Sequence, residues 1–209
     1  MTDKRIFAVS LSNNEPMSLL AGYRDGQLHI VDCKPLPRSL AKLKKTLPNR
    51  LIRLKETGFI VLVDEVMPVF GRYARSLKLS DVGTDGRPVL VSALQTYRNM
   101  VNLQAITFPP TDSGAFDISE SIVEERRDLN GNISYHIDWS ELRAESTLLL
   151  LVIAGAMQES LLDACTTISL LKQLGGQHSA PSYSNPFEAI TRQYDRRFLS
   201  DDALGNSNE

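Results

Sequence analysis

The sequence is poor in the residues that mark several common classes of protein. Of its 209 residues only two are cysteines, Cys33 and Cys165, and they stand far apart without a metal-ligand pattern. The three histidines, His29, His136 and His178, are scattered and have no zinc-site spacing. These absences argue against a zinc protein, and we expect both cysteines to be reduced core thiols.

Long apolar runs and a strong net charge are also missing. The most apolar run, residues 147–157, has 11 residues, whereas a membrane-spanning helix needs roughly 20. The N-terminal apolar segment is broken at Asn13, which leaves no room for the hydrophobic region of a signal peptide. A net charge of −2 argues against a generally basic nucleic-acid binder, but it leaves room for a local basic face. We therefore expect a cytoplasmic protein with no membrane partner.

Familiar catalytic motifs are absent as well. The chain has no glycine-rich phosphate loop and no serine-centred nucleophile elbow. His136 stands two residues from Asp138, and a polar surface pair explains that spacing. Trp139, the one tryptophan, is expected to anchor the core or the base of a hairpin.

What is present is the composition of an ordinary globular protein, with 42% apolar and 23% charged residues. The length suits one domain with a tail. We place the domain at residues 1–176. Residues 177–209 are expected to hold a linker, an amphipathic helix over residues 186–198 and a disordered tail.

The first third of the chain predicts a three-stranded antiparallel meander followed by a helix. Strands are predicted at residues 6–11, 17–23 and 28–33, with Asp25-Gly26 in a tight turn between the second and third. Residues 39–54 have helical spacing, and we expect Pro48 to break or kink that helix.

The middle of the chain predicts a buried strand at residues 59–65, which a helical crossover would lay parallel to the first strand. Arg72, Arg75 and Lys78 recur every third residue and predict a short helix with a basic face. An amphipathic helix follows at residues 89–101, and a strand at residues 103–108.

The last part predicts a hairpin and a buried helix. Asn130-Gly131 joins two arms, residues 121–128 and 133–137, and the charges of the first arm predict that the hairpin projects into solvent. Asp138 or Ser140 can cap the next helix, which runs through the apolar residues 147–157. Because that run is apolar all round, we expect the helix to be buried.

Asp64 and Glu65 stand where the buried strand ends. In open α/β sheets, ligands collect outside the carboxyl ends of the strands, so this is a natural place for a functional carboxylate. The alternative is that the two acids only mark the return of the chain to solvent.

The order of elements is that of the ribonuclease H-like fold. The stretches that carry the resemblance are residues 7–12, Arg24-Asp25-Gly26, Val63-Asp64-Glu65, Asn130-Gly131 and the helix from Glu141 to Ala156. Over about residues 5–175 the chain resembles the nuclease domain of phage large terminase subunits. The resemblance implies an α/β fold: a mixed sheet, made of the meander and parallel strands, flanked by helices, with a projecting β-hairpin and a helical C-terminal extension.

The resemblance also implies a site. In that family, acids from the first strand, the end of the fourth strand and the last helix hold two divalent ions, Mg²⁺ or Mn²⁺, which cleave DNA. Here the second position is filled by Asp64 or Glu65, and the third by Asp138, Glu141 or Glu145. We expect Asp64, Glu65 and Glu145 as metal ligands if the protein is active. The first position departs from the family, because the first strand offers only Ser10 and Ser12.

Since a serine hydroxyl is a poor ligand for a hard divalent ion, we hypothesise a degenerate nuclease or a regulator in phage DNA maturation or packaging. Active metal-dependent DNA endonuclease is the alternative. The expected nucleic-acid contacts are Lys42, Lys44, Lys45, Arg72 and Arg75, although a solvated basic surface would look the same. A different hypothesis is a non-catalytic scaffold that binds a phage or host protein through the hairpin or the helix of residues 186–198.

Overall fold

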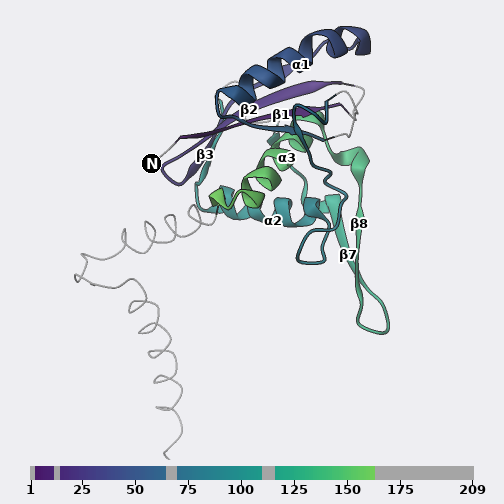
Figure 1. Ribbon diagram of the computed structural model, residues 1–209. Coiled ribbons are helices and arrows are strands. Elements are labelled where there is room, and N and C mark those ends of the chain that lie inside the picture. The colour runs from purple at the N-terminus through teal and green to yellow at the C-terminus, as the bar shows by residue number, and fades with distance from the viewer. Residues whose placement is uncertain (1–2, 12–14, 65–69, 110–115, 163–209) are drawn as a thin grey trace, which may run out of the picture. The chain divides into compact units, whose positions relative to one another are not determined.

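The computed structural model describes residues 3–11, 15–64, 70–109 and 116–162 (Figure 1). All of them lie in one compact unit, Met1–Leu170. The predicted linker, amphipathic helix and tail after residue 176 lie outside the described residues and stay predictions.

A mixed six-stranded sheet forms the centre of this unit, with strand order β5-β4-β1-β2-β3-β6. Its strands are β1 Lys4–Ser10, β2 Met17–Arg24, β3 Gln27–Pro35, β4 Ile60–Val63, β5 Arg75–Ser76 and β6 Ile106–Thr107. β1, β2 and β3 are the predicted antiparallel meander. β4 lies parallel to β1 on the other side, β5 is parallel to β4, and β6 is parallel to β3.

The turn between β2 and β3 shows how local sequence sets this topology. Asp25 and Gly26 have φ angles of 52° and 79°, a left-handed pair that matches the twist of a tight hairpin. Three antiparallel strands continued by a parallel strand beside the first make a ribonuclease H-like α/β sheet. The predicted fold class is thereby confirmed.

One face of the sheet is covered by α1, Leu40–Glu56 (Figure 1). Leu43, Leu47 and Leu51 are its buried residues. They pack in a cluster with Phe7, Val9, Val61, Val63 and Phe70. Of the predicted break or kink at Pro48, the break is wrong, because the helix is continuous through the proline. Burial of three leucines spaced four residues apart outweighs the loss of one backbone hydrogen bond at the proline.

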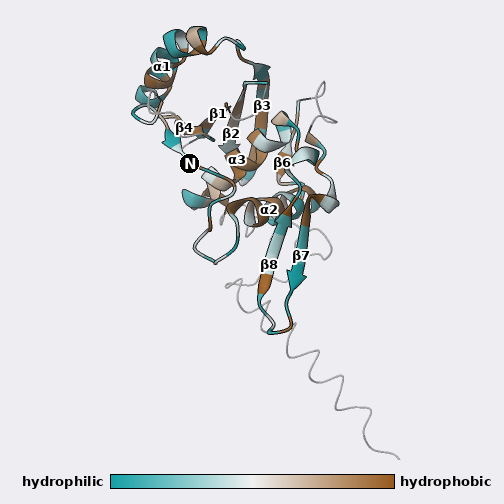
Figure 2. Ribbon diagram, turned by 90° about the vertical axis from the view of Figure 1, so that its right-hand side faces the viewer, coloured by the Kyte–Doolittle hydropathy of each residue, from teal (hydrophilic) through white to brown (hydrophobic). Residues whose placement is uncertain are grey.

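The opposite face is covered by α2, Val89–Asn102, and α3, Ala144–Gln158 (Figure 1). Residues 146–156 of α3 are all buried, as the apolar run predicts, and α3 contacts β1, β2 and β4. Figure 2 shows the hydrophobic character of this helix between the sheet and α2. No helix among the described residues has the length and hydropathy to cross a membrane.

Two elements differ from the sequence-based expectation. The predicted short basic helix around Arg72, Arg75 and Lys78 is instead a turn followed by the edge strand β5. Asp138 caps only the 3₁₀ turn Trp139–Glu141, and α3 begins after a break at Leu142 and Arg143. The backbone groups of these segments do not form the hydrogen bonds of a continuous helix. After β5, for example, the Leu77 N–H donates to the Val63 carbonyl at 3.0 Å.

The predicted hairpin is confirmed as β7, Val123–Arg127, and β8, Ile133–Ile137, preceded by the 3₁₀ turn Glu120–Ile122 (Figure 1). Its loop spans residues 128–132, where the Asp128 N–H donates to the Asn132 carbonyl at 3.0 Å. Gly131 takes a φ of 82°, which only glycine and few other residues adopt readily. The glycine of the Asn-Gly pair therefore closes the turn.

Candidate functional site at the carboxyl ends of β1 and β4

The ends of β1 and β4 meet because the two strands are parallel neighbours. Val9 is paired with Val63, and the Asp64 N–H donates to the Val9 carbonyl at 3.2 Å. The next residue of β1 is Ser10. Ser10 is fully buried and Asp64 is only 8% exposed, so two polar side chains lie together at the sheet edge where such folds bind ligands.

Asp64 is held by β1 through both of its carboxyl oxygens. The Ser10 hydroxyl donates to Oδ2 at 2.5 Å, and the Leu11 N–H donates to Oδ1 at 2.9 Å. A buried carboxyl group needs such donors to offset its desolvation. Ser10 and Asp64 are thus in direct, buried contact where the two parallel strands end.

In the described part of the site, this arrangement lacks the carboxylates of a centre for two divalent ions. Such a centre needs several carboxylates from neighbouring elements, whereas β1 contributes a hydroxyl and a backbone N–H that already donate to Asp64. Among the described residues, no three His, Cys, Asp or Glu side chains are grouped so that they could hold a metal ion. Glu65 lies outside the described residues, so the expected ligand set of Asp64, Glu65 and Glu145 stays a prediction.

The other predicted acids have local structural contacts. Oδ1 of Asp138 accepts from the Ser140 hydroxyl at 2.6 Å and from the Ser140 N–H at 3.0 Å. The Ser140 hydroxyl and then its N–H hold the pKa of Asp138 below its usual range. Glu141 is exposed in the 3₁₀ turn. Glu145 is half-buried in the first turn of α3, where a carboxylate interacts favourably with the helix dipole.

The basic residues predicted on α1 form an exposed cationic surface. Lys42, Lys44 and Lys45 are all exposed. Sequence reasoning left out the rest of this set, although the same helical pattern contains it: Arg50, Arg53 and Lys55 are exposed too. Glu56 is the one acid within the helix, and in the described part of the structure none of the six cations belongs to an ion pair. We call these six residues the α1 basic face.

Arg72 and Arg75 differ in their surroundings. Arg72 lies beside the end of α1, where it lines a shallow hollow of about 360 Å³ with Ile52, Lys55, Glu56 and Tyr73. Arg75 instead donates to Oε1 of Glu159 at 2.8 Å, next to the C-terminal end of α3. Arg72 therefore adds a cation beside the α1 basic face and has no ion pair in the described part of the structure, whereas Arg75 is paired with Glu159.

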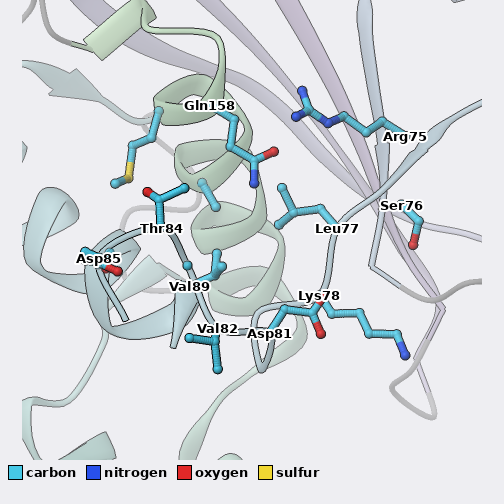
Figure 3. A pocket seen from close by; sticks show the side chains of 14 residues that line it. Arg75, Ser76, Leu77, Lys78, Asp81, Val82, Thr84, Asp85, Val89 and Gln158 are labelled. Carbon is cyan, nitrogen blue, oxygen red and sulfur yellow. The ribbon is translucent and has the colours of Figure 1, made fainter. Parts of the chain in front are cut away.

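A larger hollow, of about 680 Å³, lies beside the end of β5 (Figure 3). Its lining combines residues of β5, the loop of residues 81–85, the start of α2 and the end of α3. At its rim the Asp85 carboxyl accepts from the Ser92 hydroxyl at 2.7 Å and the Arg87 N–H at 3.1 Å. The Ser92 hydroxyl and then the Arg87 N–H lower the pKa of Asp85. Sequence patterns could not indicate this hollow, because four separate segments build it.

Comparison with known proteins identifies no family model and no curated protein that matches this sequence. Among solved structures, the chain is similar to the large terminase of a thermophilic bacteriophage, with 12% identity and a TM-score of 0.48, over 74% of this chain and 40% of that one. It is also similar to the nuclease domain of the Thermus phage P74-26 large terminase, with 11% identity and a TM-score of 0.46, over 75% and 80% of the two chains.

A third similar structure is the large terminase nuclease from thermophilic phage G20c with bound magnesium, with 13% identity and a TM-score of 0.44, over 75% of this chain and 82% of that one. The chain spans less than half the length of the first of these terminases. At these identities the likeness concerns the fold alone, and the ribonuclease H-like fold stated above rests on the strand order and directions of this chain.

Proposed function

We propose that this protein is a degenerate ribonuclease H-like nuclease that binds nucleic acid without cleaving it. In this proposal it acts in phage DNA maturation or packaging, either as a reduced nuclease or as a regulator of one. The proposed contact surface is the α1 basic face together with Arg72.

The observation that carries the proposal is the hydrogen bond from Ser10 to Asp64. Two-ion cleavage of a phosphodiester needs carboxylates that are shared between the ions. At the end of β1 this chain offers a donor to Asp64 where a second carboxylate would be required. The hydrogen bond from Ser10 supports a structural role for Asp64. It also supports the absence of efficient metal-dependent cleavage, because the hydroxyl stands in place of a metal-binding carboxylate.

The α1 basic face supports the binding part of the proposal. Lys42, Lys45 and Arg53 lie on the side of the helix away from the buried leucines, at spacings of three and eight residues, which are about one and two helical turns. Such a row suits the phosphates of a nucleic-acid backbone. Side chains alternate along β1, so Ser10 lies on the sheet face of Ile6 and Ala8, opposite α1. Binding at α1 is therefore separate from the Asp64 carboxyl.

The test is the salt dependence of binding to a fluorescent duplex DNA, measured by anisotropy with EDTA present. The wild-type chain should bind with an affinity that falls steeply with salt. Changing Lys42, Lys45 and Arg53 together to Gln should weaken binding and lower the slope of log K against log salt by about 2–3, one for each lost phosphate contact.

A matched control is the triple change of Arg24, Lys34 and Arg126 to Gln. It removes the same net charge, but each of these cations already has an acidic partner, at 3.3, 2.5 and 2.7 Å respectively. This control should retain most of the affinity. Equal losses in the two triple variants, or no DNA binding by the wild-type chain at low salt, would contradict the proposal.

A further inference from the structure

One edge of the projecting hairpin has free backbone groups. The Asp138 N–H donates to the Ile122 carbonyl at 2.9 Å, and the Asp128 N–H donates to the Asn132 carbonyl at 3.0 Å. In an antiparallel pair, residues alternate between bonding to the partner strand and pointing away from it. The even-numbered residues of β8 therefore bond to β7. The N–H and C=O groups of Ile133, Tyr135 and Ile137 point to the other edge, where β8 has no strand partner among the described residues.

The two strands of the hairpin differ in how their edges are protected. β7 carries four consecutive charges, Glu124, Glu125, Arg126 and Arg127, and charged side chains discourage pairing at a strand edge. β8, with the sequence ISYHI, contains no Asp, Glu, Lys, Arg or Pro, and its pairing with β7 has no bulge. In Figure 2 β7 is mainly hydrophilic, whereas β8 is partly hydrophobic. The β8 edge is thus unprotected.

The pattern of β8 is also symmetric about Tyr135. Ile133, Tyr135 and Ile137 share one face of the hairpin, and Ser134 and His136 share the other. Read in either direction, the strand alternates apolar and polar residues in the same order. In an antiparallel copy of the same strand, apolar residues therefore lie opposite apolar residues, and Ser134 lies opposite His136.

We propose that a second copy of this chain pairs with β8 edge to edge, in an antiparallel register centred on Tyr135. Tyr135 then lies opposite Tyr135 of the second copy, and Ile133 lies opposite Ile137 of the second copy. The outward N–H and C=O groups of these residues bond across a two-fold axis, and the hairpins join into one continuous sheet. No like charges meet in this register.

Exposed apolar side chains favour this partner. Ile133 is 46% exposed and Trp139 is 47% exposed, and Leu129 at the hairpin tip is fully exposed. In the proposed register the tip of one hairpin reaches the level of Trp139 of the second copy. Pairing would therefore cover the apolar groups that solvent now reaches, and the contribution of buried apolar area adds to the backbone hydrogen bonds.

A nucleic-acid partner is disfavoured at the hairpin by its charges. Glu124 pairs with Arg126 at 2.7 Å, and Glu125 pairs with Arg127 at 3.1 Å. These pairs balance each other within β7, so the hairpin has no excess of cations for phosphates. The dimer contact is accordingly distinct from the α1 basic face.

Sedimentation equilibrium of the full chain tests the dimer. The wild-type chain should show twice the chain mass in the micromolar range. Tyr135→Lys places two ammonium groups opposite each other at the two-fold axis and should give a monomer. The matched control Val31→Lys introduces a lysine on a different strand, at a residue of β3 that is 56% exposed, and should stay dimeric. A monomeric wild-type chain, or a Tyr135→Lys variant that still dimerises, would overturn the proposal.

A cross-linking pair tests the register independently of stability. Directly opposed residues in an antiparallel hydrogen-bonded pair have Cα atoms about 5.5 Å apart, within the range that a disulfide spans. Tyr135→Cys should therefore form a covalent dimer on mild oxidation. Glu125→Cys, opposite Tyr135 but on β7, should cross-link no more than the wild-type chain does. Equal cross-linking of the two variants would contradict pairing through β8.

Discussion

At the scale of single residues, Ser10 and Asp64 show how one side chain changes what a site can do. A hydroxyl at the end of β1 donates to the buried Asp64 carboxyl, whereas a carboxylate in its place would repel that group unless a cation lay between them. The same position can thus support either a metal centre or a structural contact, and this chain has the residue that suits the contact.

Removing the Ser10 hydroxyl should destabilise the fold. Because Ser10→Ala leaves a buried carboxyl oxygen without one of its donors, we expect the free energy of unfolding to fall by about 1.5–3 kcal/mol. Guanidinium-induced unfolding measures the change. Ser18→Ala is the matched control, since Ser18 is also buried, on β2, but within the described residues its hydroxyl makes only a 3.4 Å contact with the Lys34 carbonyl. An equal loss in both variants would argue against a special role for the Ser10–Asp64 contact.

Asp85 should make stability depend on pH in the acid range. Its pKa is lowered by the Ser92 hydroxyl and the Arg87 N–H, so its carboxylate stabilises the folded state above the pKa of the unfolded chain. That contribution is lost as the pH falls through the lower folded pKa, in the range below about 4. Asp85→Asn should therefore have a lower Tm than the wild-type chain at neutral pH, and the gap should narrow below about pH 4.

Asp81→Asn is the control for this effect, because Asp81 lies in the same loop and its carboxyl makes no hydrogen bond in the described part of the structure. Thermal unfolding followed by circular dichroism across the acid range measures both variants. A gap between Asp85→Asn and the wild-type chain that stays constant with pH would show that Asp85 acts without its charge.

At the scale of elements, the packing of α3 on β4 depends on one glycine. A Cβ atom at position 155 would lie 2.3 Å from Cδ1 of Leu62, a fully buried side chain. Gly155→Ala should therefore overpack the core and lower the free energy of unfolding by about 1–3 kcal/mol. Gly22→Ala is the control, because a Cβ there meets no atom within 4 Å.

A double variant identifies the cause of that loss. If the clash with Leu62 is responsible, adding Leu62→Ala to Gly155→Ala should cost less than the sum of the two single changes, because the added methyl fills part of the space that the leucine leaves. If the losses in the free energy of unfolding are additive, the cost of Gly155→Ala does not come from the contact with Leu62.

The elements that sequence reasoning predicted correctly have strong local signals. The meander follows from strand-forming runs separated by Asp25-Gly26, and the buried helix follows from an apolar run without polar interruption. β5 was missed because its two residues are too few for a periodic pattern, and pairing with β4 rather than propensity determines their conformation. The break predicted at Pro48 does not occur, because burial of the leucines of α1 outweighs the local effect of the proline.

The candidate site was predictable only in part. Parallel pairing of β1 and β4 followed from the order of elements, which is why Ser10 and Asp64 could be expected to meet. Asp138 could be predicted as a cap, because it accepts from Ser140 two residues later, but the element that it caps is a 3₁₀ turn. The pairing of Arg75 with Glu159 depends on tertiary positions that no sequence spacing contains. The hollow beside β5 depends on four segments at once, so no single stretch could indicate it.

At the scale of the whole molecule, the described unit separates its proposed activities in space. The α1 basic face lies on one side of the sheet, and the Ser10 and Asp64 side chains lie on the other side, with α3. The hairpin that we propose for dimerisation projects from a third place (Figure 1). We therefore expect Asp64→Asn, studied where the variant remains folded, to retain the DNA affinity of the wild-type chain in the anisotropy assay. A loss as large as that of the α1 triple variant would contradict this separation.

The central claim is that Asp64, which accepts a hydrogen bond from Ser10, has a structural role and no longer holds catalytic metal ions. Plasmid cleavage tests this claim most directly. Supercoiled plasmid is incubated with the wild-type chain and with Asp64→Asn, in Mn²⁺ and in Mg²⁺, and the relaxed and linear forms are quantified. We predict no cleavage by the wild-type chain above the level of Asp64→Asn with either ion. Efficient cleavage that Asp64→Asn abolishes would contradict the account and would make this protein an active nuclease.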